Sequence, residues 1–176
     1  MAGTRGGPVR RGLDGLDKAL IGTLCANGRL AASEIATRLG VSTPTVRGRL
    51  RHLLSGGVLR IAAMVDASEM PELTVAIVGL SLERYNLDEM VERVAALDEV
   101  SWAAVVTGRY DIIAQVVTAD GMNGLYEFLN ASLQKLGGVQ SSEVFVVMKA
   151  TDKWLVVPPA MAAAWAGANG GQGHDA

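Results

Sequence analysis

The sequence predicts an α+β protein in which an N-terminal winged-type helix-turn-helix precedes a C-terminal ferredoxin-like domain with the element order βαββαβ. Residues 33–54 carry apolar side chains at helical spacing on both sides of Gly40, and strand and helix patterns alternate after residue 72. Residues 1–61 hold ten Lys and Arg against three Asp and Glu, a formal charge of +7, whereas residues 62–176 hold six against fifteen, or −9. This segregation predicts a nucleic-acid-binding module joined to an acidic module with another role.

The first 12 residues are rich in Gly and Arg and predict a disordered arm. A first helix is expected where Leu13, Leu16, Leu20, Ile21 and Leu24 repeat at helical spacing before Asn27-Gly28. Two further helices follow, with the apolar positions Ile35, Ala36 and Leu39, and then Val46, Leu50, Leu53 and Leu54. Gly40 permits the positive φ of a tight turn, and Ser42 is placed to cap the second of these helices.

After Gly56-Gly57, residues 58–65 are β-prone and predict a wing or a linker strand. We therefore expect a DNA-binding domain at 13–61. A linker strand is expected at 62–71, with the polar, turn-rich stretch 66–71 as the domain boundary.

The C-terminal domain is expected at 72–157. Its predicted strands and helices are the strand 73–82, the helix 87–97, the strands 100–107 and 110–117, the helix 122–136 and the strand 139–148. Because the strands are apolar on both faces and two helices cover only one, a second subunit is expected on the other face. Residues 154–157 predict an added edge strand. The Ala/Gly-rich stretch 158–176 predicts a flexible tail with at most one or two frayed helical turns.

The outward face of the second helix-turn-helix helix is basic, which favours contact with DNA. Thr43, Thr45 and Arg51 are candidates for reading bases, and Arg47 and Arg49 for phosphates. Ser33, Ser42 and His52 complete the candidate DNA-binding set. Gly48 lies in mid-helix, where glycine costs roughly 1 kcal/mol relative to Ala. Two interpretations stay open for it: close approach of the backbone to DNA, or an imperfection that the fold tolerates.

Several stretches in the same order resemble the Lrp/AsnC (feast/famine) family of transcription regulators, over about residues 13–157. They are LDGLDKALIGTL, GRLAASEIATRLGVSTPTVRGRLRHLLSGGVL, GRYDIIAQV and LGGVQSSEVFVVM. The resemblance implies an N-terminal domain that binds double-stranded DNA. It also implies a C-terminal domain that dimerises, often assembles to octamers, and binds an amino acid or similar small effector.

The resemblance also implies an effector site near the G-x-[YF]-D turn, here Thr107, Gly108, Arg109, Tyr110 and Asp111. A second contact region corresponds to Gly138, Val139, Ser141 and Ser142, where the family's usual Pro-Gly is replaced by Gly137-Gly138. Asp111 is suited either to accept hydrogen bonds from an ammonium group or to fix the turn. Gly108 and Asp111 are also common hairpin residues, so a purely structural turn stays open.

The residues favour a regulator over an enzyme, with no catalytic residue, metal or cofactor expected. The only histidines are His52 and His174, and carboxylates such as Asp111 and Glu143 have no evident partners. The alternatives are a ferredoxin-like binding protein or enzyme with an accessory nucleic-acid-binding domain, and a pure assembly protein. Cys25 falls in an apolar helical pattern and predicts a buried side chain. With no long apolar run and no signal-peptide core, we expect a cytoplasmic protein that does not engage a membrane.

Overall fold

The computed structural model describes residues 12–83, 86–151 and 154–168, and the chain divides into two compact units between Ala62 and Ala63. The predicted arm lies outside the described residues except for Gly12, and residues 169–176 of the predicted tail, including His174, lie outside them as well. Each unit has its own hydrophobic core.

Three helices make up the N-terminal unit: α1 (Gly15–Ala26), α2 (Ala32–Leu39) and α3 (Thr43–Ser55). The core consists of the buried side chains Leu20, Leu24, Ile35, Ala36, Val46 and Leu53. Gly40 ends α2 with φ 66°, and the Ser42 hydroxyl accepts a hydrogen bond from the Thr45 amide at the start of α3. The predicted helix-turn-helix is thus confirmed, together with the local residues that form its turn.

Three side chains of this unit are more exposed than the apolar pattern predicts. Leu13 is 38% exposed because α1 begins only at Gly15, after the capping residue Asp14. Leu54 is 43% exposed because a helix turns about 100° per residue, which carries it from the buried Leu53 past the edge of the core. The prediction of a buried Cys25 is also wrong, because this side chain is exposed near the C-terminal end of α1.

The predicted wing is absent, because residues 58–64 form no strand. Val58 and Ile61 are each 54% exposed and have no strand to pair with among the described residues. Strand β1 is limited to Val65–Asp66 and pairs with β6 (Trp154–Leu155), with Val65 opposite Leu155. A short 3₁₀ turn, η1 (Ala67–Glu69), follows β1. The sequence pattern predicted that the last strand would join an edge of the main sheet. This prediction is wrong, because β6 pairs with β1 of the linker in a separate two-stranded sheet.

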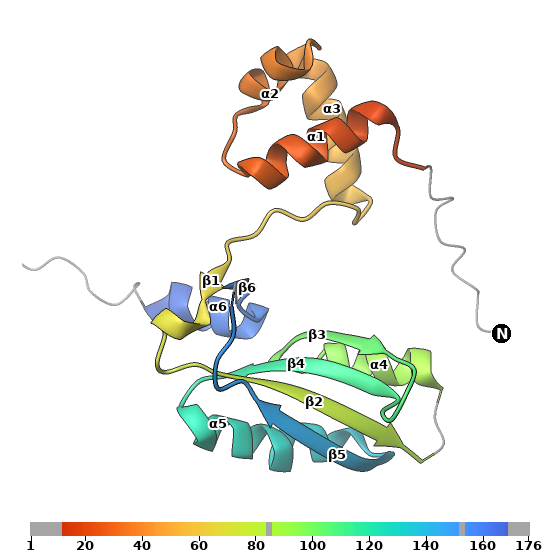
Figure 1. Cartoon of the computed structure of the whole chain (residues 1–176), viewed down its shortest axis with the longest axis vertical. Coiled ribbons are helices and arrows are strands. Elements are labelled where there is room, and N and C mark those ends of the chain that lie inside the picture. The colour runs from red at the N-terminus through yellow and green to blue at the C-terminus, as the bar shows by residue number, and fades with distance from the viewer. Residues whose placement is uncertain (1–11, 84–85, 152–153, 169–176) are drawn as a thin grey trace, which may run out of the picture. The chain divides into compact units, whose positions relative to one another are not determined.

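The main sheet has four antiparallel strands in the spatial order β3-β4-β2-β5. They are β2 (Thr74–Leu82), β3 (Val100–Val105), β4 (Ile112–Thr118) and β5 (Val139–Val146). One face of the sheet carries α4 (Leu87–Ala95) and a second helical segment formed by α5 (Gly121–Glu127), the π-helical η2 (Phe128–Leu133) and the 3₁₀ turn η3 (Gln134–Leu136) (Figure 1). The predicted ferredoxin-like order is confirmed.

The core of this unit lies between the sheet and the helices. It is formed by Ala76, Val78, Leu80, Met90, Val94, Val100, Ile112, Ala114, Val116, Leu125, Phe128, Leu133 and Leu136. The opposite side, here called the open face, is formed by Val75, Ile77, Trp102, Ile113, Gln115 and Phe145. Trp102 is 45% exposed and Phe145 is 47% exposed on this face. Such exposure of large apolar side chains on a sheet favours a protein partner.

The C-terminal stretch is more ordered than its composition predicts. Helix α6 spans Pro159–Ala168, whereas the sequence pattern predicted at most one or two frayed turns. Proline favours the first position of a helix, and the alanines that follow have the highest helix propensity. None of the helices in the described part of the chain is long and apolar enough to cross a membrane.

Candidate functional site

The exposed side of α3 carries most of the predicted DNA-binding residues. Thr45, Arg47, Arg51 and His52 are exposed, whereas Thr43 is half-buried. The hydroxyl groups of Ser42 and Thr45 lie 2.7 Å apart and share a hydrogen bond at the start of the helix. Ser33 is exposed on α2. A basic, solvent-facing helix after a tight turn is the geometry with which such motifs enter the major groove.

Arg49 differs from this set, because its side chain reaches back to α1. Its Nη1 atom lies 2.5 Å from Asp14 Oδ2 and 3.1 Å from Asp17 Oδ1. The hydrogen bond from the Asp17 amide, followed by that from Arg49, lowers the pKa of Asp14, and the hydrogen bond to Asp14 raises the pKa of Arg49. The predicted role of Arg49 in binding phosphate therefore competes with an ion pair inside the helical unit.

Gly48 is not required for packing within the helical unit. A Cβ atom built at this position has no atom within 4 Å among those compared, so an alanine side chain would fit there. Packing in the described part of the chain therefore gives no reason for the glycine. Close approach of the backbone to DNA and a tolerated imperfection both stay open as interpretations.

The turn between β3 and β4 covers residues 106–111, because β3 ends at Val105 and β4 begins only at Ile112. Gly108 has φ 124°, a conformation that favours glycine. Asp111 ties the turn to β2: its Oδ2 accepts a hydrogen bond from the Leu82 amide at 2.8 Å, and its amide donates to the Leu80 carbonyl at 2.9 Å. Of the two roles open for Asp111, the structure thus shows the one that fixes the turn.

Tyr110 and Arg109 both meet Glu143 of β5. The Tyr110 hydroxyl donates to Glu143 Oε2, and the guanidinium of Arg109 lies 3.3 Å from the same oxygen. The hydrogen bond to Glu143 raises the pKa of Tyr110. The expectation that Asp111 and Glu143 lack partners was therefore wrong.

The ring of Tyr110 lies against the backbone of Gly79 on β2. A Cβ atom at position 79 would come within 2.7 Å of that ring, so the contact requires glycine. The ring also meets Phe145 edge-on, with centroids 6.4 Å apart. Through the ring of Tyr110, the turn thus packs on the open face against β2 and β5.

The second predicted contact region lies around the start of β5. Val139, Ser141 and Ser142 line a pocket of about 530 Å³ together with Leu129, Asn130, Leu133, Gln134, Gly137 and Gln140. Gly138 precedes the strand with φ 71°. Because side chains alternate along a strand, Ser141 and Ser142 point to opposite faces of this sheet edge.

The pocket at the start of β5 does not include the turn between β3 and β4. The turn residues 107–111 are not among those that line the pocket at the start of β5. Glu143 connects the regions, since it follows Ser142 directly and pairs with Tyr110 and Arg109. The sequence offered one signal for Glu143, which is the only charged residue of its strand, but its partners lie more than thirty positions earlier.

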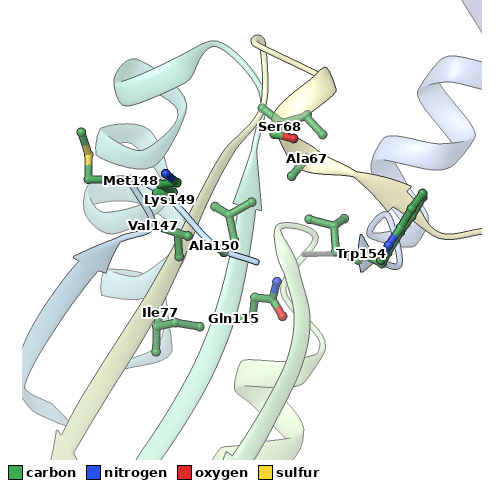
Figure 2. A pocket seen from close by; sticks show the side chains of 12 residues that line it. Ala67, Ser68, Ile77, Gln115, Val147, Met148, Lys149, Ala150 and Trp154 are labelled. Atoms are coloured by element: carbon green, nitrogen blue, oxygen red, sulfur yellow. The ribbon is translucent and has the colours of Figure 1, made fainter. Parts of the chain in front are cut away.

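Another pocket, of about 450 Å³, lies at one end of the open face (Figure 2). Its wall combines Ile77 and Gln115 from the sheet with Ala67 and Ser68 after β1 and with Trp154 of β6. None of the predicted effector residues lines it. In the described ranges, no cluster of three or more His, Cys, Asp or Glu is arranged to hold a metal ion.

Two family models match the two units. Residues 13–54 match the AsnC-type helix-turn-helix domain, and residues 75–153 match the Lrp/AsnC ligand binding domain. An uncharacterized HTH-type transcriptional regulator of Pyrococcus furiosus is 36% identical over 143 residues, which cover 81% of this chain and 95% of that protein.

Solved structures with similar folds are also named as regulatory proteins. The leucine response regulatory protein of Mycobacterium tuberculosis has a TM-score of 0.70 and 26% identity, covering 83% of this chain and 100% of that one. A transcriptional regulator of Neisseria meningitidis in complex with L-Met has a TM-score of 0.62 and 26% identity, covering 81% of this chain and 96% of that one. These names are those of transcriptional regulators and not of enzymes.

Proposed function

Because this chain belongs to the Lrp/AsnC family of transcriptional regulators, we propose that it binds double-stranded DNA through α3 and changes its DNA binding or assembly when an amino acid binds. The observation that carries the proposal is the pairing, in one chain, of a basic helix-turn-helix with a separate ligand-binding domain. The proposal places the protein in the cytoplasm, where its DNA is.

On α3, we assign Thr45 and Arg51 to base edges and Arg47 to phosphate. These side chains are exposed on the helix, and arginine is the commonest partner of guanine in the major groove. Thr43 is half-buried and Ser42 caps the helix, so both act mainly by fixing its first turn. Gly48 lets the helix backbone lie close to DNA.

A second copy of this chain is the occupant that we assign to the open face. Trp102 and Phe145 are too large and too exposed to suit a free surface, and the antiparallel sheet is covered by helices on one side only. A dimer built in this way supplies two copies of α3 for two DNA half-sites. Octamers are an extension of the same proposal through other surfaces of the dimer.

The effector in this proposal is an amino acid bound near residues 107–111 and the start of β5. The L-Met complex of the Neisseria regulator supports an effector of this class. Thr107, Gly108 and Gly138 offer backbone groups to a carboxylate, while Asp111 and Glu143 offer carboxylates to an ammonium group. The effector shifts the protein only if it binds two assembly states with different affinity.

Asp111→Asn is expected to weaken effector binding about tenfold or more and to leave the fold intact. Asparagine Oδ1 can still accept the hydrogen bond from the Leu82 amide, but the charge that recognises an ammonium group is lost. A thermal-shift screen against the common amino acids identifies the ligand, and calorimetry with that ligand measures the change. Glu127→Gln on α5 removes one carboxylate elsewhere in the unit and serves as the control. Equal affinities for Asp111→Asn and the parent would show that Asp111 only shapes the turn.

A further inference from the structure

The carboxylates of Asp14 and Asp17 lie at the start of α1. Two of their four oxygen atoms form the helix cap, and the other two bind Arg49. Asp14 Oδ1 accepts the Asp17 amide at 2.9 Å, and Asp17 Oδ2 accepts the Asp14 amide at 3.3 Å. The other two oxygens, Asp14 Oδ2 and Asp17 Oδ1, both accept from Arg49 Nη1. Every oxygen of the pair thus has a partner, and the capping box holds both carboxylates ready for the arginine.

The burial of this cluster distinguishes it from an ordinary surface ion pair. This holds for Asp17, whose side chain is 8% exposed, whereas those of Arg49 and Asp14 are 31% and 37% exposed. A guanidinium held between two fixed carboxylates has little freedom to swing out toward a phosphate. Moving it would also leave the nearly buried carboxylate of Asp17 without its charged partner, which is costly.

The cluster constrains the orientation of α3, which the apolar core contacts of this helix constrain only weakly. Val46, Leu50 and Leu53 attach α3 to the other helices through apolar contacts, which depend on buried area and little on angle. Charged hydrogen bonds to fixed acceptors depend strongly on geometry. Arg49 lies in the middle of α3, two positions from both Arg47 and Arg51 in sequence. Its ion pairs with α1 therefore fix the rotation of α3 about its axis, and with it the direction of Arg47 and Arg51.

We propose that Asp14, Asp17 and Arg49 form a positioning cluster that orients α3 on DNA, so that Arg49 determines specificity without contacting phosphate itself. This inference rests on the proposed DNA-binding function. The cluster holds two negative charges and one positive charge close to the DNA-binding helix, which by charge alone opposes DNA binding. The cluster is therefore explained by its effect on the orientation of α3 and not by electrostatic attraction to DNA.

Asp17→Asn separates the two roles of Arg49 by the sign of the effect. The asparagine Oδ1 can keep the hydrogen bond from the Asp14 amide, while its NH₂ group cannot accept from Arg49. If Arg49 contacts phosphate, releasing it and removing a negative charge will tighten DNA binding. If the cluster positions α3, the same change will loosen binding to the preferred sequence.

The test uses the full chain and the DNA sequence that the parent protein selects from a random library, beside an unrelated duplex of equal length. Fluorescence anisotropy gives Kd for both duplexes over a range of salt concentrations, and thermal melting confirms that each variant is folded. The variants are Asp17→Asn and Arg49→Met, with Arg47→Met as the matched control on the same helix.

We expect Asp17→Asn and Arg49→Met to lose about tenfold or more in affinity for the selected sequence, the size of one base-reading contact. Their affinity for the unrelated duplex should follow only the change in net charge, with a slight rise for Asp17→Asn and a slight fall for Arg49→Met. The slope of log K against log salt should stay near that of the parent, because no phosphate contact is lost. Arg47→Met should weaken both complexes alike and reduce that slope by about one.

Tighter binding of Asp17→Asn to the selected sequence, or a slope reduced by about one in Arg49→Met, would overturn the proposal in favour of a phosphate contact. The proposal would also be overturned if Asp17→Asn and Arg49→Met are folded and keep the parent's ratio of affinities for the selected and the unrelated duplex. A parent chain that selects no sequence would refute the proposed function as well, so the two failures are distinguishable.

Discussion

Phe145→Lys is expected to convert the protein to a monomer and to lower its affinity for a two-half-site DNA about a hundredfold or more, the usual gain from binding two linked sites. Phe145 is 47% exposed at the edge strand β5, so a single subunit should tolerate the change. In a dimer built through the open face, the same lysine would be buried without a fixed partner, which is strongly unfavourable. Analytical ultracentrifugation and anisotropy on the same samples measure both effects.

Met122→Lys is the matched control for this substitution. Met122 is 60% exposed on α5, in the helical layer on the other side of the sheet. It should keep the dimer and its DNA affinity. A Phe145→Lys protein that sediments as a dimer would show that the subunits associate through another surface.

Arg51→Ala is expected to weaken the complex with the selected DNA about tenfold to a hundredfold and to relax the preference at one base pair. A bidentate arginine contact to guanine is worth about 1–3 kcal/mol of discrimination. Arg51 is exposed on α3 and forms no hydrogen bond or ion pair among the described residues, so the change should not disturb the fold. Repeating the library selection with the variant measures the lost preference.

Arg29→Ala controls for the loss of one positive charge. Arg29 is exposed in the connection between α1 and α2 and is not part of α3, so its removal should change affinity only slightly and equally for all sequences. If Arg51→Ala behaves like Arg29→Ala, with uniform weakening and no change in base preference, the assignment of Arg51 to a base edge is wrong.

Features that depend on neighbouring residues could be predicted from the sequence. The turn of the helix-turn-helix follows from Gly40 and Ser42, whose conformation and hydrogen bond are local. The order of strands in the sheet follows from alternating strand and helix patterns, because short connections place the elements in few ways.

Features that depend on distant partners could not be predicted in this way. Arg49 pairs with residues 32 and 35 positions earlier, and nothing in the periodicity of α3 distinguishes it from Arg47. The partners of Glu143 and the pairing of β1 with β6 are similarly distant. Helix α6 is a different case, because its Ala/Gly-rich stretch has little apolar area to bury, while alanine has the highest helix propensity.

Control of DNA binding by an amino acid is the core of the proposed function. Its most direct test is an anisotropy titration of the selected DNA with the full protein, with and without saturating amounts of the amino acid found by thermal shift. We expect salt-sensitive binding whose Kd changes about fivefold or more with the ligand, the usual range of coupling between two sites. A Kd that stays the same with every amino acid that stabilises the protein would contradict the claim.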